Sequence, residues 1–137
     1  MNMIASAVTA SPLGDNNSRA EPVKIWKARR YIEENSDEKI SLNQVANLLE
    51  MNATHLSEKF KQVTGITFVD YVARVRFIRA RALLQDSDLR ISEIAFAVGF
   101  QSLSQFNRVF KKFSGKSPTE CRNGLTSGRH RKNLTLD

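Results

Sequence analysis

The sequence predicts an all-α protein with two similar helical subdomains, a long helix that connects them, and about seven helices in all. Two observations lead to this prediction. Apolar residues recur three and four positions apart along most of the chain after residue 22, which is the spacing of one helix face. A pattern of a short helix, a tight turn and a longer helix occurs twice, once on either side of the connecting stretch.

The first helix is predicted to begin at Pro22 and to end near Glu34. Residues 1–21 are rich in Ala, Ser, Asn and Gly and show no sustained period, so we expect a disordered leader or the remnant of a linker there. Proline suits the first position of a helix, because the amide hydrogen that it lacks has no helical partner at that position. The apolar positions at helical spacing in this helix are Ile25, Ala28 and Ile32.

The first copy of the repeated pattern covers about residues 40–65. Ser41 precedes the short helix and Gln44 follows three residues later, which is the pattern of a capping box. A brief turn leads into a longer helix over about residues 53–64, and Gly65 can end that helix. The apolar positions of this copy are Leu42, Val45, Ala46, Leu49, Leu56, Phe60 and Val63.

A connector helix is predicted over residues 67–85, with Thr67 as its cap. Its apolar residues cover more than one side, and such a helix usually packs against more than one neighbour. One stripe consists of Phe68, Tyr71, Val72, Val75, Ile78 and Ala82. Three further residues widen that stripe: Phe77, Ala80 and Leu84.

The second copy covers about residues 91–115, and its longer helix has two contrasting faces. The short helix carries apolar residues at Ile91, Ile94, Ala95 and Val98. In the longer helix, over about residues 102–114, three phenylalanines share one face: Phe106, Phe110 and Phe113. The side chains between them are polar or cationic: Ser104, Asn107, Arg108, Lys111 and Lys112. Such a helix has one side for a protein core and another for a polyanion.

Capping signals mark both ends of that longer helix. Ser102 with Gln105 forms a capping-box pattern, and Gly115 can stop the helix. A further helix is then predicted to begin at Ser117, because Pro118 suits the first helical position and a glutamate follows at the third.

The two copies align with one another along their whole length. The short helices match at an offset of 49 residues and the longer helices at an offset of 50, so the second turn contains one extra residue. A short helix, a tight turn and a longer helix form a helix-turn-helix, in which the second helix enters the major groove of DNA. The connector would span roughly 25 Å, so two such helices could reach successive major grooves about 34 Å apart.

The distribution of charge agrees with a nucleic-acid partner. The chain has a net charge of +7, yet residues 1–100 carry 13 basic and 12 acidic side chains. Residues 101–137 carry 8 basic side chains and only 2 acidic ones, so the excess lies on and after the second copy. The alternative is a solvated basic tail; residues 124–137 are predicted to form a flexible one, in which Arg129–Lys132 could add nonspecific affinity for DNA.

The sequence resembles the DNA-binding domain of the AraC family of bacterial transcription regulators over residues 22–123. The resemblance lies in Ile91–Ala95, Gly99-Phe100, Phe106–Lys112, Gly115 and Ser117-Pro118. It implies two helix-turn-helix subdomains, binding to double-stranded promoter DNA, and activation of transcription through contact with RNA polymerase. The sequence departs from the family pattern at Gln105 and Cys121, where an aromatic residue and a tyrosine are usual. Both positions are predicted to serve packing.

The resemblance places the base-reading residues of the second copy at Leu103, Ser104, Asn107 and Arg108. Arginine pairs with guanine and asparagine with adenine in the major groove, and leucine can contact a thymine methyl group. Two alternatives stay open: Leu103 as a core residue, and Arg108 as a phosphate or salt-bridge contact. The residues assigned to phosphate in this copy are Ser102, Lys111 and Lys112, which would fix the register without reading sequence.

The offset of 50 transfers these roles to Thr54, Ser57, Glu58 and Lys61 of the first copy, with Lys61 at phosphate. Glu58 stands where the second copy has arginine, and its carboxylate would repel phosphate, although it could accept a hydrogen bond from cytosine. Alternatively, Glu58 is a solvent-facing residue that pairs with a lysine. We therefore expect the second copy to contribute more to DNA affinity.

The remaining residues predict neither an enzyme nor a metal or cofactor site. The chain has two histidines, of which His55 lies on the longer helix of the first copy, and a single cysteine, predicted to be a small buried hydrophobe; it has no glycine-rich phosphate loop. No apolar run approaches the roughly 20 residues of a membrane span. The cysteine usage and the lack of a signal-like start fit a bacterial cytoplasmic, nucleoid-associated protein.

Several features of the resemblance leave alternatives open. The connector carries four arginines: Arg74, Arg76, Arg79 and Arg81. We expect them to form salt bridges with Asp70, Asp86 or Asp88, and contact with DNA is the alternative. Residues 1–21 are too short for a ligand-sensing domain, so we expect no small-molecule effector site and either a stand-alone DNA-binding protein or the C-terminal part of a longer one.

Two linked reading helices allow a monomer to bind an asymmetric site. A protein-interaction module and sequence-independent DNA packaging are the competing functions.

Overall fold

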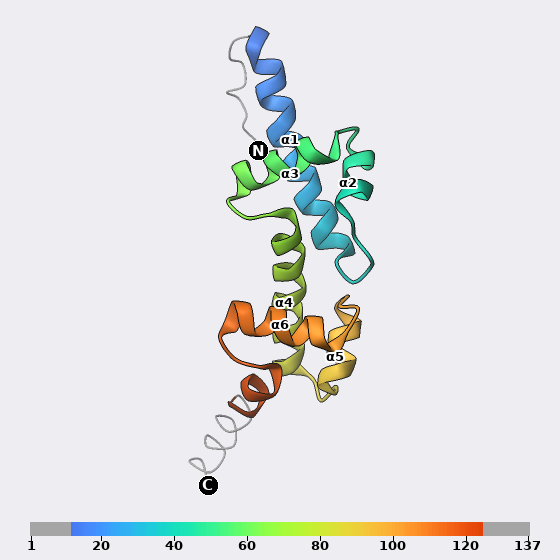
Figure 1. Cartoon of the computed structure of the whole chain (residues 1–137), viewed down its shortest axis with the longest axis vertical. Helices are drawn as coiled ribbons and strands as arrows, with labels where there is room; N and C mark the ends of the chain where they lie inside the picture. The colour runs from blue at the N-terminus through green and yellow to red at the C-terminus, as the bar shows by residue number, and fades with distance from the viewer. Residues whose placement is uncertain (1–11, 125–137) are drawn as a thin grey trace. The chain divides into compact units, whose positions relative to one another are not determined.

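The computed structural model describes the backbone of residues 12–124 and, from Pro22 onward, their side chains. Within this part of the chain every regular element is a helix, which confirms the predicted all-α class (Figure 1). The helices are α1 Pro12–Asn35, α2 Leu42–Leu48, α3 Ala53–Thr64, α4 Phe68–Asp86, α5 Ile91–Ala97 and α6 Leu103–Ser114. A seventh helical segment follows over residues 118–124.

The start of α1 differs from the sequence prediction. The helix begins at Pro12, so Pro22 lies inside it, and the prediction that residues 12–21 lack regular structure is wrong. Proline is favoured in the first turn of a helix, but elsewhere it removes only one backbone hydrogen bond, and the helix can continue past it. Of the predicted leader and basic tail, residues 1–11 and 125–137 lie outside the described residues.

The chain divides into two compact units, and α1 and α4 contribute to both. Among the described residues, the first unit contains 12–31 and 41–68, and the second contains 32–40 and 69–124. The first unit therefore holds α2 and α3, and the second holds most of α4 together with α5 and α6. The last turn of α1 and the segment that follows it belong to the second unit, which the sequence pattern did not predict.

The first unit is built on the buried face that the helical spacing predicts. Its fully or almost fully buried apolar residues are Ile25, Ala28, Val45, Ala46, Leu56, Phe60 and Phe68. The rings of Phe60 and Phe68 meet edge to face with centroids 5.6 Å apart. Ser41 caps α2 as predicted, because its hydroxyl accepts a hydrogen bond from the Gln44 amide at 3.1 Å. Val63, the third apolar position of α3, is 51% exposed and lies outside this core.

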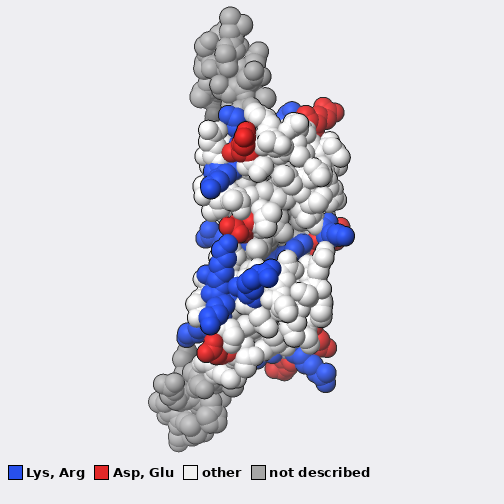
Figure 2. All heavy atoms as spheres, viewed as in Figure 1, with Lys and Arg blue, Asp and Glu red and all other residues white. Residues whose placement is uncertain are grey.

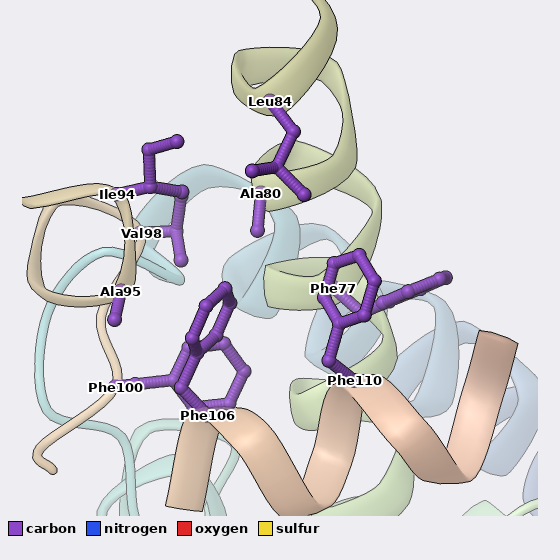
Figure 3. Packing of buried hydrophobic residues seen from close by; sticks show 9 residues of the cluster. All are labelled: Phe77, Ala80, Leu84, Ile94, Ala95, Val98, Phe100, Phe106 and Phe110. Atoms are coloured by element: carbon purple, nitrogen blue, oxygen red, sulfur yellow. The ribbon is translucent and has the colours of Figure 1, made fainter. Parts of the chain in front are cut away.

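The second unit has a core of phenylalanines that come from α4, α6 and the turn between α5 and α6 (Figure 3). Phe77 of α4 packs edge to face on Phe110 of α6, with ring centroids 4.9 Å apart. Phe106 lies between Phe110 and Phe100, at centroid distances of 5.6 and 5.2 Å. Phe113 and Cys121 are partly buried against the same cluster, as the sequence predicts for both. These contacts hold one face of α6 in the core and leave the opposite face outside.

The buried side of α4 is narrower than its apolar pattern indicates. Phe77, Ala80 and Leu84 are buried in the second unit, whereas Ile78 is 55% exposed and Ala82 is also exposed. The predicted stripe was therefore wrong at two positions. On α4, an apolar side chain at helical spacing is buried only where another segment covers it, and the periodicity of α4 does not show which segment does so.

Arg76 and Gly99 join three segments of the second unit. Arg76 is almost completely buried, and it donates hydrogen bonds to the carbonyls of Ser36 and Glu38, both at 2.8 Å. Burial lowers the pKa of this guanidinium from its ordinary value. Gly99, in the turn between α5 and α6, has a φ of +111°, and a Cβ there would lie 2.2 Å from the Ser36 carbonyl oxygen. The end of α1 thereby fixes the turn that precedes α6.

None of the helices within residues 12–124 combines the length and the hydrophobicity that crossing a bilayer requires.

Candidate nucleic-acid interface

The start of α6 is set by a side-chain cap. The Ser102 hydroxyl accepts a hydrogen bond from the Gln105 amide at 3.1 Å, which confirms the predicted N-cap. The Gln105 carboxamide accepts from the amide of Gln101 at 3.2 Å instead of that of Ser102, so the box is displaced by one residue. Ser102 is exposed, so its hydroxyl can donate a hydrogen bond to a phosphate while its oxygen accepts from Gln105.

The outer face of α6 carries the side chains that the sequence assigns to DNA. Ser104, Asn107, Arg108 and Lys111 are all exposed, while Phe106 and Phe110 on the inner face are completely buried. Leu103 is 40% exposed, which argues against its alternative as a core residue. In Figure 2, Lys and Arg side chains gather over the part of the second unit where Figure 1 places α6. The face is therefore polar, basic and open to a large partner.

Lys112 lies at the edge of this face and is engaged by a carboxylate. Its Nζ forms a salt bridge of 2.9 Å with Asp70 of α4, and both side chains remain accessible, at 55% and 39%. It also lies 5.7 Å from the centre of the Phe113 ring. An exposed pair of this kind contributes about 0–1 kcal/mol, so a phosphate could replace Asp70 at small cost. The sequence did not predict this pair, because its members are 42 residues apart.

The outer face of α3 contains the corresponding residues of the first copy. Asn52 caps this helix by accepting from the amides of Thr54 and His55, at 2.9 and 3.2 Å. Thr54, Glu58 and Lys61 are exposed, and Ser57 is half-buried. The assigned residues thus share one accessible face here as well, but an acidic side chain interrupts it.

The two longer helices end in the same way. Gly65 and Gly115 adopt the left-handed conformation, with φ of 87° and 80°, and each amide returns to a lysine carbonyl of the last turn. The residue before each glycine has a hydroxyl, and the hydroxyls of Thr64 and Ser114 each donate to the carbonyl four residues back at 2.7 Å. The predicted helix ends are confirmed in both copies, and they set equal lengths for the two exposed faces.

Comparisons with known proteins identify this arrangement. The model of a family described as a helix-turn-helix domain matches residues 45–124. The melibiose operon regulatory protein of Escherichia coli is 37% identical over 92 residues, which are 67% of this chain and 30% of that protein. The transcriptional activator RhaS of an Enterobacter species is 31% identical over 112 residues, 82% of this chain and 38% of its own.

A solved structure agrees with these relatives. The transcriptional regulator from Chromobacterium violaceum, described as containing an AraC-type DNA-binding domain, superposes with a TM-score of 0.69 at 29% identity. The match covers 79% of this chain and 96% of that one. The chain belongs to the AraC-type helix-turn-helix family. The chain thus contains an AraC-type DNA-binding domain, and it spans about a third of the length of the curated relatives named above.

The segment after α6 forms a capped helical turn and is hydrogen-bonded to the loop before α5. Ser117 and Glu120 form a reciprocal capping box, with distances of 2.8 and 3.1 Å, as the sequence predicts. The hydrogen bond from the Ser117 amide, followed by that from its hydroxyl, lowers the pKa of the Glu120 carboxyl from its ordinary value. Arg122 donates to the carbonyls of Leu89 and Ser87, which joins this segment to the loop before α5.

The arginines of α4 do not behave as one group. Arg76 donates to the carbonyls of Ser36 and Glu38, just after α1, and Arg79 donates to the carbonyl of Glu33 near the end of α1. These contacts replace the salt bridges that were predicted for the two arginines. Arg74 and Arg81 are exposed. His55 is half-buried on α3, and within the described residues no three His, Cys, Asp or Glu side chains are grouped to hold a metal ion.

Proposed function

We propose that this chain regulates transcription by reading a specific promoter sequence with α6 and α3, and that it acts as an activator. The observation that carries the proposal is the outer face of α6, where an arginine, an asparagine and a serine are exposed opposite two completely buried phenylalanines. A helix-turn-helix uses this face to reach base edges. The name of the related activator RhaS supports activation over repression.

Each assigned side chain of α6 has a chemical counterpart in the major groove. Arg108 suits the O6 and N7 acceptors of guanine, and Asn107 suits the N6 and N7 edge of adenine. Ser104 can contact several bases, and Leu103 suits a thymine methyl group. Lys111, the Ser102 hydroxyl and, after exchange from Asp70, Lys112 are assigned to phosphate.

The first copy is proposed to make the weaker contribution. Thr54, Ser57 and Glu58 would face bases, and Lys61 would contact a phosphate. Because Glu58 carries a negative charge at the position of Arg108, it opposes the approach of phosphate and restricts favourable contacts to a cytosine amino group. Two helices on one chain allow binding as a monomer to an asymmetric site that spans successive major grooves.

The wider setting follows from this function. We expect the regulator to act in the bacterial cytoplasm on the nucleoid and to contact RNA polymerase at the promoter. The proposed function involves no catalytic step, and no cofactor, metal ion or small-molecule effector enters it.

Selection of bound sequences from a random pool of duplex DNA tests the proposal. The selected duplex and a scrambled duplex of equal composition are then titrated at two salt concentrations. We expect a preference of about 10³-fold or more for the selected duplex, while both affinities fall as salt rises. Equal affinity for the two duplexes would instead indicate DNA packaging, and no binding to either would indicate a protein-interaction module.

A further inference from the structure

One exposed stripe of α4 is bounded by contacts on both sides. On one side, Asp70 forms its salt bridge with Lys112 of α6. On the other side, the Tyr71 hydroxyl donates to the carboxylate of Glu33 at the end of α1. Between these contacts lies a helix face whose residues follow Asp70 at intervals of four, four and three positions. Its exposed members are Arg74, Ile78 and Arg81.

The two arginines of this stripe lie on either side of the point where α6 crosses α4. That point is Phe77, whose ring packs on Phe110 at a centroid distance of 4.9 Å (Figure 3). It also packs on Phe113 at 5.5 Å. Arg74 precedes Phe77 by about one helical turn, and Arg81 follows it by about one turn. With a rise of 1.5 Å per residue, the two positions are about 10 Å apart along α4.

This separation matches the geometry of a groove. A helix inserted in the major groove has one phosphate backbone on each of its sides, and the groove is about 12 Å wide. We infer that Arg74 and Arg81 form a phosphate clamp on DNA, with one guanidinium directed at each backbone that borders the groove occupied by α6. This inference rests on the proposed function, and it adds α4 to the binding surface.

The chemistry of the stripe suits phosphate. Guanidinium groups bind phosphate oxygens through paired hydrogen bonds, and they keep their charge at any physiological pH. Asp70 is the acidic residue one turn before Arg74, and its carboxylate contacts Lys112 at 2.9 Å. Through that pair the stripe also adjoins the basic edge of α6. Because phosphates carry no sequence information, the clamp would raise affinity without changing the preferred sequence.

The test compares three double variants of the full chain on the selected duplex and on a scrambled duplex. Arg74→Gln with Arg81→Gln removes both guanidinium charges, and Arg74→Lys with Arg81→Lys keeps the charges. Lys27→Gln with Lys39→Gln is the matched control, because it removes two exposed charges that lie on neither α4 nor α6. Binding constants are measured over a range of salt concentrations, and ethylation interference locates the phosphates that matter.

We expect the glutamine pair to weaken binding to both duplexes by a similar factor, on the order of tenfold, and to reduce the slope of log K against log salt by about 1.8. Ethylation of one phosphate on each side of the α6 groove should interfere with the wild type but not with this variant. The lysine pair should keep most of the salt slope.

Two results would overturn the inference. One is a salt slope for the glutamine pair equal to that of the Lys27→Gln, Lys39→Gln control. The other is a loss confined to the selected duplex, which would indicate base reading. Failure of the proposed function looks different: the wild type would then show no preference between duplexes, while the salt slope on scrambled DNA would still report on the two arginines.

Discussion

The two helix-turn-helix copies share a framework and differ in how the turn is packed. α2 and α5 have 7 residues each, and α3 and α6 have 12 each. Both turns contain one residue in the left-handed region: Glu50 with φ of 56° in the first copy, and Gly99 with φ of 111° in the second. Glu50 is exposed, whereas a Cβ on Gly99 would lie 2.2 Å from the Ser36 carbonyl oxygen. The motif places one residue with a positive φ in each turn, and the packing of the neighbouring segment determines whether a side chain fits at that residue.

The copies also differ in the charge of their outer faces. α6 carries Arg108, Lys111 and Lys112 and no acidic residue. α3 carries Glu58 together with Lys59 and Lys61. The same framework can therefore present a strongly basic face in one copy and a nearly balanced face in the other. The predictions below test both differences, from the largest expected effect to the smallest.

Alanine should lower the folding stability much more in the second turn than in the first. Gly99→Ala places a methyl group against backbone in a left-handed conformation, and we expect a loss of about 2–5 kcal/mol of folding free energy. Glu50→Ala keeps the conformation in open space and should change stability by less than about 0.5 kcal/mol. Urea unfolding followed by circular dichroism measures both. Equal losses at the two positions would contradict the proposed difference in packing.

The buried arginine should matter mainly to the second unit. Arg76→Met leaves the Ser36 and Glu38 carbonyls without their donors, and we expect a loss of about 2–4 kcal/mol. Hydrogen exchange should then accelerate in α5 and α6 more than in α2 and α3, because both carbonyls belong to the second unit. Arg76→Lys, which retains one donor group, should lie between the wild type and the methionine variant. Uniform acceleration across both copies would argue against a local role.

DNA affinity should depend more on α6 than on α3. Arg108→Ala is expected to weaken binding to the selected duplex by about 1–3 kcal/mol and to relax the sequence preference at one base pair. Glu58→Ala should leave affinity unchanged or raise it, because it removes a charge that repels phosphate. Fluorescence anisotropy with the selected duplex and with single-base variants measures both effects. A larger loss from Glu58→Ala would reverse the ranking of the two copies.

The smallest effect concerns the edge of the basic face. Asp70→Asn releases Lys112 for phosphate, so affinity for selected and scrambled duplexes should rise by up to about 1 kcal/mol. The salt dependence should steepen by about 0.9 if one further phosphate is contacted. Lys112→Gln should abolish this gain in the double variant. An unchanged salt slope in Asp70→Asn would show that Lys112 makes no phosphate contact.

Local sequence signals were sufficient for the helices and for the faces of α6. The caps at Ser41, Ser102 and Ser117 and the helix ends at Gly65 and Gly115 depend on residues within four positions, so they are visible in the sequence. The same holds for the burial of Phe106 and Phe110 opposite Arg108. The resemblance to the family lies in the motif residues of the second copy and in the matching first copy, and the comparisons confirm it.

The contacts that join distant segments were not predictable in this way. Arg76 meets Ser36 and Glu38 across 40 and 38 positions, and Lys112 meets Asp70 across 42. Whether Ile78 is covered, and whether Gly99 can be replaced, likewise depends on which segment lies against it. The sequence by itself determined the repeated helices, their ends and the exposed face of α6, because hydrogen bonding and side-chain spacing act within one or two turns. The tertiary structure decided the partners of the charged side chains and the residue allowed at each turn, because those depend on surfaces that folding brings together.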